Sequence, residues 1–121
     1  MADVRESLQS VMTIDGALGA SIIDADSGVP LGTVGGEALD MELAGAGSTV
    51  VVQEELRLLD ELGVDQAPED ILISLDDQYH LLRFFHATGD VFTYVVLDRD
   101  EANLALARRQ LGTVDQELEI E

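Results

Sequence analysis

The sequence predicts an α/β protein in which one five-stranded antiparallel sheet lies between helices on both of its faces. Apolar residues recur at helical spacing in three segments, and five short runs rich in β-branched and aromatic residues alternate with turn formers. The segments follow the order helix, strand, strand, helix, strand, strand, strand, helix. In 121 residues this order suits one domain, with one long helix on one face and two terminal helices on the other.

A short helix and a hairpin are predicted at the start of the chain. Asp3 and Glu6 resemble a capping box, and apolar residues at helical spacing follow them. Residues 17–23 are apolar enough for a strand buried on both faces, and the turn formers of residues 24–28 precede a second short run. Because Pro30 cannot donate a ladder hydrogen bond, that second strand should be short or lie at a sheet edge.

A long central helix is predicted from Glu37 to about Leu62. Its centre is unusual, because Gly45 and Gly47 each destabilise a helix by about 1 kcal/mol relative to alanine. Such a sequence is tolerated where something packs closely against the helix or where the helix bends. Gly63 is expected to end it.

Three strands should follow, at residues 70–75, 78–85 and 90–97, separated by good turn sequences. The third is apolar almost throughout, so it should lie in the middle of the sheet with both faces covered.

A final helix is predicted to open at Asp98 with Glu101 and to stop at Gly112. Residues 1–112 would then form the single domain, and residues 113–121 would be a frayed acidic tail. Neither an internal repeat nor a long linker interrupts this organisation.

The chain is strongly acidic, with 25 Asp and Glu residues, six arginines, no lysine and a formal net charge of −19. This balance repels phosphate backbones and anionic lipids, so nucleic acid and membrane insertion are not expected. One interpretation of the acidity is a solvated surface, from a high-salt cytoplasm or from a GC-rich genome that replaces lysine by arginine. The other is electrostatic attraction to a basic partner. The chain also lacks cysteine, an apolar run of about 18 residues and a signal-peptide pattern, which together predict a cytoplasmic protein.

Motifs that carry chemistry are incomplete in this chain. The segment GAGSTV around Gly45 begins like a glycine-rich phosphate loop, but the third glycine and the Walker lysine are missing. The turn DADSG imitates half of a calcium loop, but the twelfth position counted from Asp24 is Gly35 and not glutamate. A close-packed helix and a plain hairpin turn are the preferred interpretations.

The two histidines, His80 and His86, lie on or beside one strand, with Asp76 and Asp77 at the preceding turn. A weak metal site is one interpretation, and an exposed or half-buried, hydrogen-bonded histidine is the preferred one. No nucleophile-elbow sequence surrounds any serine. We therefore expect no cofactor, no metal, no catalytic residue and no enzymatic activity.

Two stretches, VFTYVVLDRDEANLALARRQL and GALGASIIDADSGVPLGTVGG, resemble the signature stretches of the roadblock/dynein-light-chain family, in particular its bacterial members. The resemblance covers nearly the whole chain. Members of that family have the element order predicted above, dimerise through the long central helix and the strand after it, and serve Ras-like GTPases as activators, regulators or scaffolds. The resemblance therefore implies a homodimeric interaction module with a small Ras-like GTPase as its partner.

Carried over by position, the resemblance places the dimer surface on the central helix and the third strand. The implied residues are Leu43, Gly47, Val50, Val51, Glu54, Ile71, Leu72, Ile73, Ser74 and Leu75. Small residues in the middle of the helix would let two copies approach closely, which gives Gly45 and Gly47 a physical use. An unpaired apolar edge strand would also favour pairing with a second copy. Partner binding would fall on Glu54, Glu55 and Arg57, polar positions beside the apolar stripe.

Two other classes of function stay open at this level. Profilin-like and sensor domains share a comparable five-stranded sheet, so a small-molecule or signal sensor without catalytic activity is the alternative, and a sensor kinase system is a further candidate partner. A hydrolase or GTPase is the weaker alternative, since the missing lysine argues against it.

Overall fold

The computed structural model describes residues 1–37, 39–86 and 89–120, and it confirms the predicted fold class. Its elements are α1 (Val4–Val11), β1 (Ala17–Asp24), β2 (Pro30–Gly35), α2 (Met41–Glu61), β3 (Asp70–Ser74), β4 (Gln78–Phe85), β5 (Val91–Asp98) and α3 (Leu104–Glu117). The strands form one sheet in the order β2-β1-β5-β4-β3, and all neighbours are antiparallel.

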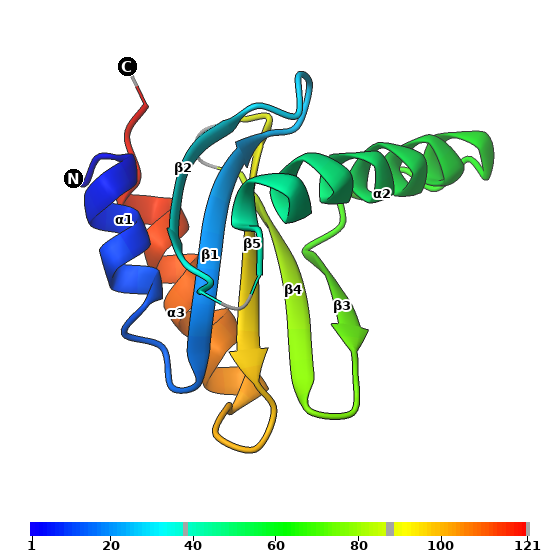
Figure 1. Cartoon of the computed structure of the whole chain (residues 1–121). Helices are drawn as coiled ribbons and strands as arrows, with labels where there is room; N and C mark the ends of the chain where they lie inside the picture. The colour runs from blue at the N-terminus through cyan, green and yellow to red at the C-terminus, as the bar shows by residue number, and fades with distance from the viewer. Residues whose placement is uncertain (38, 87–88, 121) are drawn as a thin grey trace.

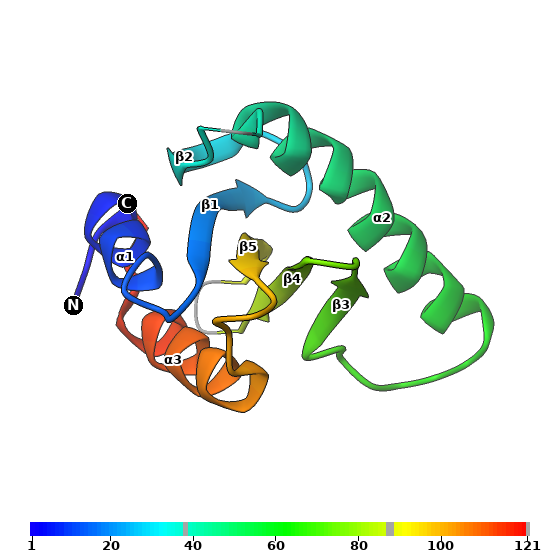
Figure 2. The same cartoon turned by 60° about the horizontal axis from the view of Figure 1, so that its bottom comes forward.

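Helices cover both faces of this sheet (Figures 1 and 2). The long helix α2 crosses one face, and α1 and α3 pack side by side on the other. As predicted, β5 is central and buried along almost its whole length. Each face has its own core. The α2 side buries Ile23, Met41, Val52, Leu82, Phe92, Tyr94 and Val96, whereas the other side includes Leu8, Val11, Leu81, Phe85, Leu97 and Leu111.

Local side-chain chemistry forms the first helix and the hairpin as predicted. The Asp3 carboxylate accepts the Glu6 backbone N–H at 2.8 Å, and the Glu6 carboxylate accepts the Asp3 N–H at 3.3 Å, which completes a capping box. The Asp24 carboxylate accepts the backbone N–H of Asp26 at 2.9 Å in a plain hairpin turn. Pro30 then begins β2, which lies at an edge of the sheet.

The central helix α2 begins at Met41 and not at Glu37. Asp40 lies in extended backbone and its carboxylate accepts the Leu43 N–H at 3.1 Å, so it is the N-cap. The end is as predicted: Gly63 takes a left-handed φ of +72°, and its N–H donates to the Asp60 carbonyl at 3.1 Å.

Both predicted ends of α3 are wrong. Asp98 does not cap the helix, because its carboxylate accepts the N–H of Asp100 within the preceding turn at 3.0 Å. Asn103 is the N-cap, and its side chain accepts the Leu106 N–H at 3.1 Å. At the other end Gly112 does not stop the helix, since it lies within α3 and does not take the left-handed φ that Gly63 takes.

The stretch after Gly112 belongs to the core. Val114 and Leu118 are 6% and 3% exposed and pack in the cluster with Leu111. Leu118 also pairs with Ala2 in a parallel bridge, so the two ends of the described chain lie together. The prediction of a frayed tail is therefore wrong for residues 113–118, whose apolar positions continue the helical spacing of α3.

Removing residues 113–121 is expected to lower the free energy of unfolding by roughly 3–6 kcal/mol, because two buried apolar side chains are lost. Urea unfolding of the full chain and of the chain ending at Gly112 measures this difference. A chain that lacks only residues 120–121 is the control and should unfold like the full chain, because Ile120 is exposed. Equal midpoints for the chain ending at Gly112 and the full chain would restore the original boundary.

Candidate functional site

Helix α2 has two apolar faces, and its inner face packs on the sheet. Met41, Gly45, Ser48 and Val52 recur at steps of three or four residues and are buried against the α2-side core. A Cβ added to Gly45 would lie 3.0 Å from the Ile23 side chain, so the small residue lets the helix approach its own strand β1.

This packing corrects the expectation that Gly45 lets two copies approach closely, whereas the same expectation for Gly47 stays a prediction. Gly45 is used within the chain and does not serve the approach of a second copy. Gly47 is different, because a Cβ added there would meet nothing within 4 Å. Gly47 therefore lies on the open side of α2.

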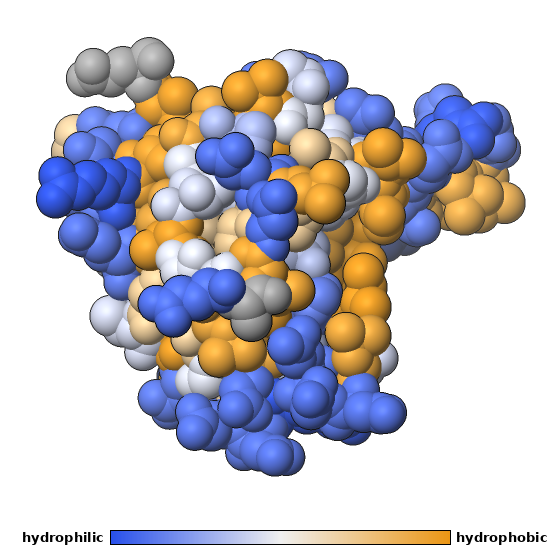
Figure 3. Space-filling model, in the orientation of Figure 1, coloured by the Kyte–Doolittle hydropathy of each residue, from blue (hydrophilic) through white to orange (hydrophobic). Residues whose placement is uncertain are grey.

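The opposite face of α2 exposes large apolar residues to solvent. Leu43 is 68% exposed, Val50 is 61%, and Val51 and Leu58 are 43% and 47%. These four residues lie with Gly47 and Glu54 along one side of the helix. We call this set the outer stripe; its six residues are Leu43, Gly47, Val50, Val51, Glu54 and Leu58. Figure 3 shows hydrophobic surface on α2 and on the region of β3. A contiguous exposed apolar surface of this kind marks an interaction site more often than a free surface.

Charged residues border the outer stripe. Arg57 forms ion pairs with Glu54, three residues before it, and with Glu61, four residues after it at 3.3 Å. The hydrogen bond that Arg57 donates to the Glu54 carboxylate raises the pKa of Arg57. Glu54 and Arg57 are exposed, whereas Glu55 is half-buried. The three residues predicted to bind a partner thus lie near one another, and two of them already pair with each other.

β3 is an edge strand, and its free edge lies on the side of the sheet toward which the C-terminal half of α2 extends (Figures 1 and 2). The Leu75 N–H donates to the Gln78 carbonyl at 2.9 Å, and the Phe84 N–H donates to the Glu69 carbonyl at 3.1 Å. In an antiparallel pair such bonds recur at every second residue. The backbone of Ile71, Ile73 and Leu75 therefore faces β4.

It follows that Asp70, Leu72 and Ser74 direct their N–H and C=O groups away from the sheet. Ile73 and Leu75 expose 38% and 43% of their surface beside these free groups. The edge thus offers ladder donors and acceptors together with apolar side chains, as a strand that pairs with another chain must. The structure brings the predicted residues of β3 to one open edge and those of α2 to one open helix face.

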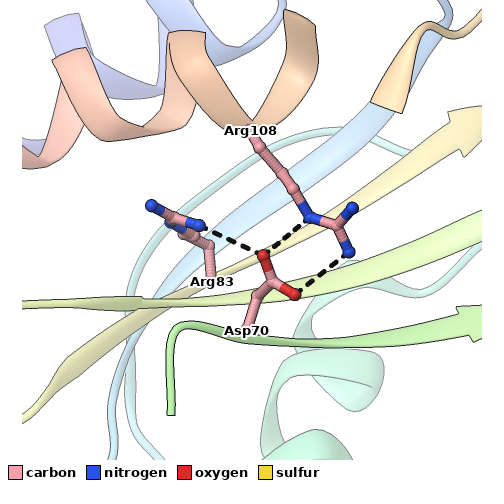
Figure 4. Close-up of polar contacts among 3 residues, drawn as sticks. All are labelled: Asp70, Arg83 and Arg108. Atoms are coloured by element: carbon pink, nitrogen blue, oxygen red, sulfur yellow. Dashed lines mark hydrogen bonds and ion pairs between the residues drawn. The ribbon is translucent and has the colours of Figure 1, made fainter. Parts of the chain in front are cut away.

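Two arginines hold β3 to its neighbours, a feature that the sequence reasoning missed. The Asp70 carboxylate accepts Arg83 of β4 at 3.1 Å and two nitrogens of Arg108 of α3 at 2.9 and 3.2 Å (Figure 4). The hydrogen bond to Asp70 raises the pKa of Arg108. Asp70 is 12% exposed, so this Asp70 cluster is largely shielded from water. An arginine inside the apolar run QYHLLRFF was the signal in the sequence.

The histidines have separate partners. The Nδ1 atom of His80 lies 2.6 Å from the Tyr94 hydroxyl, and its Nε2 atom lies 2.9 Å from the Gln78 side-chain oxygen. Burial lowers the pKa of His80 and raises that of Tyr94. The preferred interpretation of a half-buried, hydrogen-bonded histidine is thus confirmed for His80. The backbone N–H of His86 donates instead to Asp115 at 3.0 Å.

The other motifs take ordinary structural roles. Residues 45–50, which begin like a phosphate loop, are a continuous part of α2. Across residues 1–37, 39–86 and 89–120, no three His, Asp or Glu side chains gather as a set of metal ligands. In the same ranges no helix is long and apolar enough to cross a membrane.

Solved structures share this architecture, although no family model and no curated protein matches the chain significantly. A Roadblock/LC7 domain from Streptomyces avermitilis is 13% identical, with a TM-score of 0.80 over 95% of this chain and 93% of its own. MglB of Myxococcus xanthus is 14% identical, with a TM-score of 0.74 over 93% and 78%. MglC of Myxococcus xanthus is 22% identical, with a TM-score of 0.57 over 93% of both chains.

The protein therefore has the roadblock fold in its bacterial form, and the resemblance stated from the sequence is confirmed at the level of fold. In this fold the residues predicted for dimerisation occupy the outer stripe and the free edge of β3.

Proposed function

We propose that this protein is a homodimeric interaction module that regulates or scaffolds a small Ras-like GTPase and has no catalytic activity of its own. The observation that carries the proposal is the outer stripe of α2, whose apolar residues stay exposed on a helix that already buries its other face. A monomer gains nothing from such residues, whereas a partner that covers them gains the free energy of their burial.

A second copy of the chain is the proposed partner for the outer stripe and β3. Because β3 is an edge strand with free ladder groups, two copies can join their sheets about a two-fold axis. A solved MglB, 14% identical with a TM-score of 0.68, is described with a tetrameric arrangement, so a protein of this fold is known to self-associate.

The GTPase is the proposed partner for the charged border of the stripe, at Glu54, Glu55 and Arg57. This part of the proposal is supported by the family resemblance, whose members serve such GTPases, and by the net charge of −19, which favours a basic partner surface. A role as a GTPase in its own right is not proposed, because residues 45–50 are helical and the chain has no lysine to hold a phosphate.

Reversing the charge of Glu54 is expected to reduce capture of the GTPase about three- to tenfold, since it replaces a carboxylate of the proposed contact surface by a cation that repels a basic partner. Tagged wild-type and Glu54→Arg proteins would be incubated with lysate of the source organism, with GDP or a non-hydrolysable GTP analogue. The recovered small GTPases would be quantified by mass spectrometry.

Glu117→Arg is the matched control, because Glu117 is an exposed glutamate of α3 on the other face of the sheet. It changes the net charge by the same amount and should leave recovery unchanged. Equal losses for both variants would reduce the effect to overall charge. Recovery of no small GTPase by the wild-type protein in either nucleotide state would contradict the proposed partner.

A further inference from the structure

The strand at the opposite edge of the sheet, β2, also has unused ladder groups. The Gly36 N–H donates to the Leu18 carbonyl at 2.9 Å, and the Asp24 N–H donates to the Val29 carbonyl at 3.1 Å. Register pairs Ser21 with Thr33 between these bonds. Since ladder bonds recur at alternate pairs, the N–H and C=O of Thr33 point away from β1 to the open side.

A groove of about 890 Å³ runs along this edge. Its walls are α1, residues 31–34 of β2 and the segment 119–120. Helix α1 is held tightly on β2, because a Cβ added to Gly32 would lie 2.9 Å from the side chains of both Leu8 and Val4. The groove is therefore a fixed feature of the fold and does not need to open for a ligand.

Acidic side chains dominate the rim of this groove. Asp3, Glu6 and Glu119 line it together with Arg5 and with Met1, which carries an ammonium group. All five are exposed, and the capping box holds Asp3 and Glu6 in place. Leu31 and Ile120, 38% and 41% exposed, add apolar surface. A site with free ladder groups, some apolar surface and an acidic rim is complementary to an extended chain that carries basic residues.

We propose that the β2 edge binds an extended basic peptide segment of another protein, which adds a strand to the sheet and places its arginines or lysines against Asp3, Glu6 and Glu119. A second copy of this chain is a poor occupant, because it would bring the same carboxylates to the rim. Pro30 protects only the first position of β2, so residues 31–35 stay available for pairing.

The test uses a fluorescein-labelled peptide of alternating arginine and valine, about eight residues long, as strands commonly are. Fluorescence anisotropy would measure its dissociation constant for the full-length protein at about 0.05 M and about 0.5 M salt, where screening differs strongly. A peptide of glutamate and valine and an arginine–valine peptide interrupted by prolines are the matched probes. Only the uninterrupted basic peptide should bind, and more weakly at the higher salt.

Variants of the protein separate ladder pairing from plain charge attraction. Thr33→Pro removes the outward donor and should weaken binding about fivefold or more, whereas Thr33→Val keeps the donor and should not. Glu6→Gln with Glu119→Gln should weaken binding about fivefold at low salt while the capping box persists. Ser74→Pro, at the β3 edge, should leave binding unchanged. Circular dichroism would verify that each variant keeps the fold.

Several results would overturn the proposal. They are equal binding of the proline-interrupted peptide, unchanged binding by a folded Thr33→Pro variant, loss through Ser74→Pro, and absence of binding by the wild-type protein. Were Thr33→Pro unfolded, the proline-interrupted peptide would still decide whether ladder pairing is needed. Failure here leaves the proposed dimer and GTPase contact untouched, because those use the other edge and the outer stripe.

Discussion

Ser74→Pro is expected to shift the proposed homodimer toward a folded monomer. The Ser74 N–H points away from β4, so proline at this position removes a donor only from the free edge. If two β3 strands pair antiparallel along their full length, Ser74 of one copy lies opposite Asp70 of the other. Because the contact is two-fold symmetric, the substitution removes one hydrogen bond at each of two equivalent positions. Two lost hydrogen bonds weaken dimerisation by about 2 kcal/mol, or roughly thirtyfold. Sedimentation equilibrium across a concentration series measures the change.

Ile73→Pro provides the contrast, because the Ile73 backbone faces β4 within the same chain. That substitution should break the β3–β4 ladder and lower the stability of the monomer itself by more than about 2 kcal/mol. Ser74→Ala keeps the donor and should stay dimeric. A wild-type protein that sediments as a monomer at micromolar concentration, or a Ser74→Pro variant that dimerises as tightly as wild type, would contradict the proposed β3 contact.

Asp70→Ala is expected to destabilise the fold by about 2–4 kcal/mol, because it leaves Arg83 and Arg108 without their shared carboxylate. Arg83 is only 19% exposed, so its charge cannot be fully rehydrated, whereas the 38% exposure of Arg108 moderates the penalty. Urea unfolding of the wild-type and variant proteins measures the difference.

Asp65→Ala, which removes an exposed carboxylate from the loop before β3, is the matched control and should change stability by less than about 0.5 kcal/mol. The double variant Asp70→Ala with Arg108→Leu should recover part of the loss, since it removes one unpaired charge. Equal effects of Asp70→Ala and Asp65→Ala would show that the Asp70 cluster contributes nothing to the stability of β3.

Much of the fold follows from local chemistry and could be predicted. Helical spacing located the three helices, short runs rich in β-branched and aromatic residues located the five strands, and the apolar run of β5 placed it in the centre of the sheet. The capping box of Asp3 and the stop at Gly63 each depend on residues a few positions apart. Signals of this kind can be read along the chain because both partners lie in one short window.

Other features depend on contacts that the linear order hides. Asp70 and Arg108 are 38 residues apart, so their ion pair appears only when β3 and α3 are placed in space. Gly112 was predicted to stop α3 because glycine often ends a helix in a left-handed conformation. Whether it does so depends on its φ, which the sequence does not show, and Gly112 keeps a helical conformation within α3. Gly45 was predicted to contact a second copy, because the residues around it in the sequence give no sign that it packs on Ile23 of the same chain.

The carboxylates beside β2 affect how many copies of the protein can join through the edges of their sheets. A two-fold contact through β3 consumes that edge in both copies and leaves a β2 strand at each end of the joined sheet. If those ends also paired with one another, the joint would repeat without limit and build a filament. Asp3, Glu6 and Glu119 would meet their own equivalents at every such joint, so charge repulsion would end growth there and keep the proposed assembly finite.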